Sequence, residues 1–187
     1  MRGMQRERET TVEPDDLDRA RLQELLGVYA RLWLAHDGLW FQAVEDADGL
    51  EAAIAADEKA MAGFAANEGR RLKEFLGLPE RPGLDGLEQA LKFRLYAHLN
   101  EHAAVREAGR PGAPEALVFR MKTCRVQAAR ERKGMAAFPC RSVGIIEYTK
   151  FAQAIDPCIQ VECLSCPPQR SDGEAWCAWR FTVLEQG

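Results

Sequence analysis

The sequence lacks a long apolar run and an excess of positive charge, and each absence excludes a class of protein. No segment approaches the roughly 18–20 apolar residues that a membrane-spanning helix needs, so no membrane partner is expected. With 25 basic and 29 acidic residues the net charge is −4, which argues against a general nucleic-acid-binding surface. Residues 1–9 are charged and have no apolar stretch typical of a secretory signal, so a cytoplasmic protein is expected.

Motifs that would name a chemistry are also absent. There is no Gly-x-Gly-x-x-Gly, no P-loop and no Gly-x-Ser-x-Gly, so neither a nucleotide-binding fold nor a serine-hydrolase nucleophile is indicated. The segment 14–102 contains no cysteine, and all six cysteines fall in 115–187. The remaining composition, 47% hydrophobic and 29% charged over 187 residues, is sufficient for a globular core without disulfides.

The apolar periodicity changes along the chain and predicts an α+β fold. Steps of three and four predict one helix from 14–16 to beyond Trp40, a second from 48–51 to 77, and a third from Asp85 that carries Leu95 and His98. We expect a flexible lead-in at 1–13 and a single domain at 14–187, with a helical part at 14–102 packed on a small antiparallel sheet. A Gly/Pro loop is expected at 103–114, strands at 115–122, 158–164 and 175–184, and inserted helices at 124–133 and 142–155.

Three ionisable residues lie on the apolar stripes of the first two predicted helices. His36 falls between Trp33 and Trp40, and Asp57 and Glu68 follow the stripe of the next helix. Burying an isolated charge costs several kcal/mol. These residues therefore belong to a hydrogen-bonded network with arginine, or they face a cavity, or the stripe is misplaced and the carboxylates are in solvent.

In the cavity interpretation His36 is a general acid or base, and Asp57 or Glu68 orients it. Trp33 and Trp40 are then apolar walls of the pocket. Two further ligand-binding candidates are Asp37, beside His36, and Arg125, which begins a basic run suited to an anionic ligand.

The cysteines give a second candidate site. Cys163 and Cys166 are spaced so that both sulfurs can bind one metal ion from a turn, and Cys177 and Cys140 are the expected third and fourth ligands. Zinc is the expected metal. An iron–sulfur cluster, redox or disulfide chemistry, and packed thiols without metal are the alternatives. Cys124 is a separate candidate nucleophile, because a thiolate is favoured at a helix N-terminus beside an arginine.

Several segments together resemble an uncharacterised prokaryotic family described as cytosolic proteins, which is distantly similar to L-2-amino-thiazoline-4-carboxylic acid hydrolase-like proteins. The resemblance covers about residues 16–185 and rests on Trp33–Phe41, Cys124–Arg130, Phe138–Cys140, Glu147–Tyr148, Ile155–Pro157, Cys163–Pro168 and Trp176–Trp179. A fainter similarity is to 4-vinyl reductase-type domains, which end in a cysteine-bearing sheet and bind small ligands. There Cys163, Cys166 and Cys177 are the matching positions.

Three functions follow from these observations. The first is a zinc-containing module that binds or senses a small molecule. The second, implied by the hydrolase resemblance, is an enzyme that opens a small cysteine-derived heterocycle or amide, with His36 and a carboxylate, or with Cys124 as a covalent nucleophile. The third is a non-catalytic interaction subunit, in which the long first helix serves a homodimer.

Overall fold

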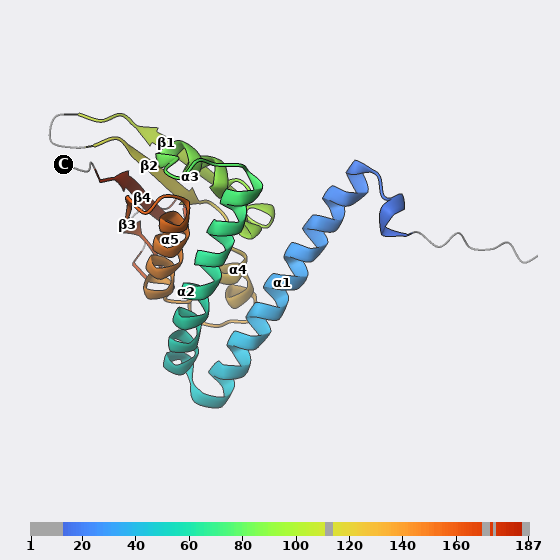
Figure 1. Ribbon diagram of the computed structural model, residues 1–187. Coiled ribbons are helices and arrows are strands. Elements are labelled where there is room, and N and C mark those ends of the chain that lie inside the picture. The colour runs from blue at the N-terminus through green and yellow to red at the C-terminus, as the bar shows by residue number, and fades with distance from the viewer. Residues whose placement is uncertain (1–12, 111–113, 170–172, 174, 185–187) are drawn as a thin grey trace, which may run out of the picture.

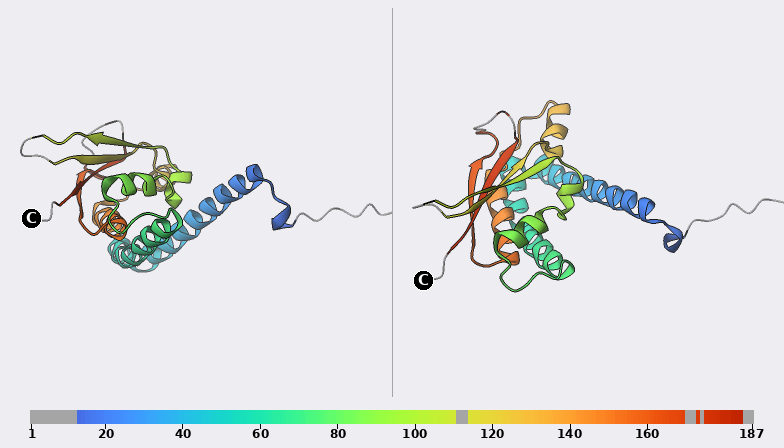
Figure 2. Two further views of the ribbon diagram at one scale, coloured as in Figure 1. Left: turned by 45° about the horizontal axis from the view of Figure 1, so that its top comes forward. Right: turned by 90° about the horizontal axis from the view of Figure 1, so that it is seen from above.

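The computed structural model describes residues 13–110, 114–169, 173 and 175–184, so the expected lead-in lies outside the described residues except for its last position. After a short 3-10 turn, η1 (Pro14–Asp16), two long helices form a hairpin: α1 (Arg19–Asp48) and α2 (Leu50–Phe75). Gly49 joins them with a φ of 88°, a conformation that glycine adopts without strain. The amino-terminal half of α1 stands away from the rest of the molecule in every view (Figures 1 and 2).

Four antiparallel strands form one sheet in the order β1-β2-β4-β3. They are β1 (His102–Glu107), β2 (Ala116–Met121), β3 (Ile159–Ser165) and β4 (Cys177–Val183). The last three were expected, but the predicted loop at 103–114 is wrong in its first part. The Ala-rich segment has weak strand propensity, and it becomes a strand because β2 offers it a hydrogen-bonding edge, with Ala104 opposite Phe119.

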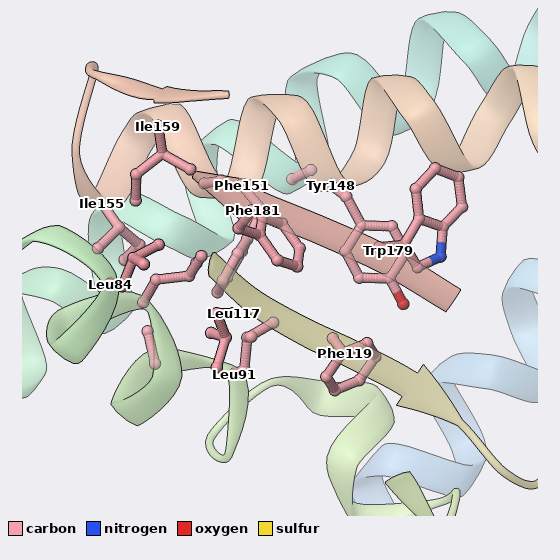
Figure 3. Packing of buried hydrophobic residues seen from close by; sticks show 14 of the residues in the cluster. Leu84, Leu91, Leu117, Phe119, Tyr148, Phe151, Ile155, Ile159, Trp179 and Phe181 are labelled. Carbon is pink, nitrogen blue, oxygen red and sulfur yellow. The ribbon is translucent and has the colours of Figure 1, made fainter. Parts of the chain in front are cut away.

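Helices α2, α3 (Gly83–Leu91) and α5 (Arg141–Ile155) lie on one side of this sheet, and α4 (Arg125–Arg132) follows β2 (Figure 2). The core between these layers includes Leu87, Leu117, Phe151 and Phe181, none of which is exposed to solvent. Figure 3 shows Tyr148 of α5 lying against Trp179 of β4, and their ring centroids are 4.8 Å apart. The α+β architecture predicted from the periodicity is therefore confirmed.

The end of the third helix and the beginning of the turn after it depend on tertiary contacts, which apolar periodicity cannot predict. The third helix ends at Leu91 rather than continuing through His98, and Leu95–His98 forms the separate 3-10 turn η2. The carboxylate of Glu68 accepts hydrogen bonds from the backbone N–H of Leu95 and from Nε of Arg94. These bonds across to α2 hold the chain in the shape that interrupts the helix.

Helices α2 and α5 cross closely at Gly69. A Cβ atom at this position would lie 2.8 Å from both the carbonyl oxygen of Phe151 and the Cβ of Ala154. The absence of a side chain thus sets how near the two helices approach, and with it the position of α5 over the sheet. Among the described residues, no helix is both long enough and apolar enough to cross a bilayer.

Candidate functional site

A cavity of about 530 Å³ lies where α1, α2, α4 and α5 meet the ends of β2 and β4. Its volume is within the range of small-molecule sites, roughly 300–1,000 Å³. Charged groups in its wall include Asp37, Asp57 and Glu147, which come from three different helices. Most of the surrounding surface is apolar and is supplied by Leu34, Phe41, Met61, Met121, Phe138, Val143 and Trp179.

Asp37 of α1 and Asp57 of α2 are half-buried in this wall, and neither forms an ion pair with a described basic side chain. Burial raises the pKa of Asp37 above its ordinary value, although the nearby His36 opposes the shift. The pKa of Asp57 is raised to about 7, first by burial and then by the negative charges of Asp37 and Glu147. A carboxyl group in this state exchanges protons readily at neutral pH.

Glu147 differs from these two because it has a cation. Nη2 of the buried Arg94 lies 2.7 Å from Glu147 and 2.8 Å from Glu68, and the guanidinium plane lies over the ring of Phe151. Burial nevertheless raises the pKa of Glu147 above its ordinary value, with Arg94 acting in the opposite direction. The expected ion-pair network therefore exists at Glu68, which does not line the cavity, whereas Asp57 faces the cavity.

His36 is not buried, so its predicted place on the inner stripe of the first helix is wrong. Its side chain is exposed, and its Nε2 accepts a hydrogen bond from the indole N–H of Trp40, which is itself 64% exposed. The inner face of α1 is displaced by one residue and carries Ala30, Leu34, Asp37 and Phe41. Apolar residues occupy both faces of this helix, and the pattern alone selected the outer one.

Trp33 occupies a position between the two faces. It is half-buried, its ring stacks on Phe64 of α2 at 4.8 Å, and it meets Tyr96 edge-on at 6.0 Å. Trp33 and Trp40 do not line the cavity, and Tyr96 does. Arg125, exposed at the start of α4, lines the cavity, and its role in ligand binding stays a prediction.

Cys124, Cys140, Cys166 and Cys177 all line the same cavity, and the Sγ atoms of Cys140 and Cys166 are 3.3 Å apart. Cys163 belongs to β3 and lies close to Cys166, but it is not part of the cavity wall. Within the described part of the chain, no group of three or more His, Cys, Asp or Glu side chains is arranged to hold a metal ion. The zinc or iron–sulfur site at Cys140, Cys163, Cys166 and Cys177 stays a prediction.

The thiol predicted to be activated at a helix N-terminus is Cys124, and its surroundings have the opposite effect. Burial raises the pKa of Cys124, so the thiolate is disfavoured there. The pKa of Cys140 is instead lowered, because Cys166 is placed to donate a hydrogen bond to its sulfur. The same contact raises the pKa of Cys166.

A comparison with protein-family models gives a match to residues 15–183, a family of unknown function (DUF6125). The chain belongs to the DUF6125 family. Comparisons with the curated proteins and with the solved structures give no match. The geometry of the cavity in this DUF6125 protein is therefore the main evidence on its function.

Sequence reasoning missed Glu147 and Tyr96 as members of the site. Glu147 is flanked on α5 by apolar residues, so the argument that singled out Asp57 and Glu68 applies to it equally. Tyr96 gave no signal, because a tyrosine in a short helical segment is ordinary. Burial raises the pKa of its phenol well above the ordinary value, so at neutral pH Tyr96 is a neutral hydrogen-bonding group in the cavity.

Proposed function

We propose that the cavity binds a small organic molecule that carries a protonated nitrogen group. The observation that carries this proposal is the pair Asp37 and Asp57, two half-buried carboxylates in an apolar cavity with no ion-pair partner among the described residues. Keeping both ionised is unfavourable because the charges repel each other where water is scarce. A cation placed between them offsets both the repulsion and the loss of hydration.

The rim of the cavity favours an acidic group at the other end of the ligand. Arg31, Arg125, Arg132 and Lys133 line the cavity and are exposed, so positive charge lies on the solvent-facing part of its wall. The buried indole N–H of Trp179 lies beside the Cys177 sulfur, a weak acceptor, in the wall of the cavity. A molecule with a cationic amine or amidine, a short apolar body and a carboxylate fits this distribution of charge.

Titration calorimetry with a panel of small amidines and amino acids, each paired with an uncharged isostere, tests the proposal. We expect cationic members to bind and to bind more tightly at pH 8 than at pH 6, because Asp57 ionises between these values. Asp37→Asn and Asp57→Asn should each weaken binding by about tenfold or more, which is about 1.4 kcal/mol. Asp46→Asn, on an exposed position of α1, is the matched control and should bind normally. Equal affinity for the uncharged isosteres would contradict the proposal.

A hydrolase is the second candidate, and Asp57 is the observation that favours it. A carboxyl with a pKa of about 7 in a cavity is suited to accept a proton from water as that water attacks an amidine or amide carbon. The carbon–nitrogen bond of the ring then breaks, and the ring nitrogen takes up the proton. In this proposal Asp57 replaces His36 as the general base, since His36 lies outside the cavity.

Incubation with thiazoline and carbamoyl compounds, followed by mass spectrometry of the products, tests the hydrolase. Ring-opened product should form with the unmodified protein, and its rate should fall at least about a hundredfold in Asp57→Asn, the usual scale for a general base. His36→Ala should leave the rate unchanged. Binding without turnover would reject the hydrolase and leave the binding proposal standing.

A further inference from the structure

Two thiols from distant parts of the chain meet in the wall of the cavity. Cys140 precedes the first residue of α5, Cys166 follows the end of β3, and 26 positions separate them in sequence. Their sulfurs are 3.3 Å apart, whereas a disulfide bond measures about 2.05 Å. Both side chains line the cavity, and Cys140 is partly exposed whereas Cys166 is buried, so a small molecule that enters the cavity meets Cys140.

The surroundings of the two sulfurs make them unequal. Nε2 of Gln127 lies 3.7 Å from the Cys140 sulfur as a donor, and Gln127 is itself fixed by two hydrogen bonds to the backbone of Phe138. Cys140 also stands at the amino-terminal end of a 15-residue helix, where negative charge is stabilised. Either sulfur can donate in the contact between them, so the groups around each sulfur decide which one keeps the proton. The Gln127 donor and the helix end both lie at Cys140, which favours Cys140 as the thiolate of the pair and Cys166 as the thiol.

We propose that Cys140 and Cys166 are a reversible dithiol pair that reacts with a small disulfide entering the cavity. The Cys140 thiolate attacks one sulfur of the disulfide, a mixed disulfide forms, and the first small thiolate leaves. Cys166 then gives up its proton and attacks the Cys140 sulfur, which expels the second small thiol. The cysteine pair is oxidised by two electrons, and the small disulfide is reduced to two thiols. This reaction does not depend on the cationic ligand proposed above.

The test uses the full chain, reduced and dialysed, with 2-hydroxyethyl disulfide as the probe and peptide mass spectrometry as the measurement. The expected product is a disulfide between Cys140 and Cys166. Cys166→Ser should stop the reaction at a mixed disulfide on Cys140, and Cys140→Ser should leave Cys166 unmodified. Cys158→Ser, at a thiol that does not line the cavity, is the matched control and should give the same product as the unmodified chain.

A second readout does not depend on the oxidant. At pH 7 iodoacetamide should alkylate Cys140 at least about tenfold faster than Cys124, because the thiolate is the reacting form. A disulfide between Cys163 and Cys166, an unreactive Cys140, or stoichiometric zinc that is lost in Cys140→Ser would overturn the proposal. Folding of each serine variant is checked by circular dichroism, and a Cys166→Ser protein that folds but does not accumulate the mixed disulfide counts against it.

A separate observation concerns the outer face of α1, which is apolar and uncovered. Leu22, Leu26, Tyr29, His36 and Trp40 follow one another at steps of four, three, seven and four, the spacing of a helix that pairs with another helix. The large apolar side chains on and beside this seam that do not line the cavity are between 46% (Leu22) and 64% (Trp40) exposed. No described part of the chain packs against this face.

We infer that a second copy of the chain covers it, through α1 of each copy related by a two-fold axis. At about 200 Å² for each large side chain, the five exposed side chains Leu22, Leu26, Tyr29, Leu32 and Trp40 leave roughly 550 Å² open on each copy. Two copies together would bury about 1,100 Å², which exceeds the roughly 1,000 Å² expected of a biological interface. Two-fold pairing matches the seam with itself and therefore requires no other partner.

Sedimentation velocity decides the matter. The unmodified chain should sediment as a dimer, and Leu26→Glu combined with Tyr29→Glu should sediment as a monomer with an unchanged circular dichroism spectrum. Gln23→Glu, on the same turn of the helix but off the seam, is the control and should remain a dimer. A monomer at high micromolar concentration, or a double variant that remains dimeric, would overturn the inference.

Discussion

Replacement of Asp57 by asparagine should make the protein more stable, and the gain should depend on pH. In the folded chain the pKa of Asp57 is about 7, against an ordinary value of 3.8, so folding holds the proton. The contribution of Asp57 to stability is fully present below about pH 4 and is lost as the pH rises through 7. The whole difference corresponds to about 4 kcal/mol at 1.36 kcal/mol per pH unit. Asp57 is partly open to solvent, so we expect about half of this, about 2 kcal/mol, to be observed.

Asparagine cannot ionise, so the Asp57→Asn variant does not lose this stability as the pH rises. The free energy of unfolding of the variant, relative to the unmodified chain, should rise by about 2 kcal/mol between pH 4 and pH 8, which is about 4–8 °C in Tm for a chain of this size. Urea unfolding of dialysed protein at several pH values measures the difference. Asp46→Asn controls for the loss of one negative charge. A difference that stays constant from pH 4 to pH 8 would refute the reasoning, because it would mean that Asp57 is ionised as easily in the folded chain as in the unfolded one.

Three further predictions follow from the packing. Gly69→Ala should lower the free energy of unfolding, measured in urea, by about 1–3 kcal/mol, because the new methyl group meets Phe151 and Ala154. Gly63→Ala on the same helix is the control: its methyl group meets nothing within 4 Å, and it should raise the free energy of unfolding by up to about 1 kcal/mol. Arg94→Met should lower the free energy of unfolding by about 3–5 kcal/mol, because it leaves Glu68 and Glu147 buried without a cation. Arg70→Met, which breaks an exposed ion pair, is the control and should cost about 1 kcal/mol at most. An equally small loss in Arg94→Met would contradict the buried network. His36→Ala should leave ligand binding unchanged in calorimetry, and weakened binding would return His36 to the site.

The order and kind of most elements could be predicted because their patterns are local. The alternating pattern identified β2, and steps of three and four identified α1, α2 and the beginning of α3, because these patterns depend on neighbouring residues in the chain. The strand β1 could not be found in this way. Its stability comes from its pairing with β2 and from the ion pairs of Arg106 with Glu88 and Glu115, which are contacts between separate segments.

The site was predicted in part for the same reason. The cost of burying a carboxylate singled out Asp57 and Glu68. In the structure Asp57 faces the cavity, and Glu68 forms an ion pair with Arg94. The sequence did not show which face of α1 points inward, because both faces are apolar. As a result His36 was predicted to lie on the inner face, where the structure places Asp37. The cysteines were grouped by their spacing as Cys163 with Cys166, whereas folding places Cys140 against Cys166. The separation of these cysteines in the sequence gives no sign of that contact.

The position of β4 in the middle of the sheet has a consequence for how the protein is made. β2 and β3 do not pair with each other: β2 pairs with β1 and β4, whereas β4 is the described strand that pairs with β3. Until Cys177–Val183 has been synthesised and released from the ribosome, β3 has no neighbouring strand and the apolar face of β2 has no completed sheet around it. Pairing between Leu117 and Phe181 also closes a long loop, which is a slow step in folding. The sheet is therefore completed, and β3 joined to it, only after β4 has been made.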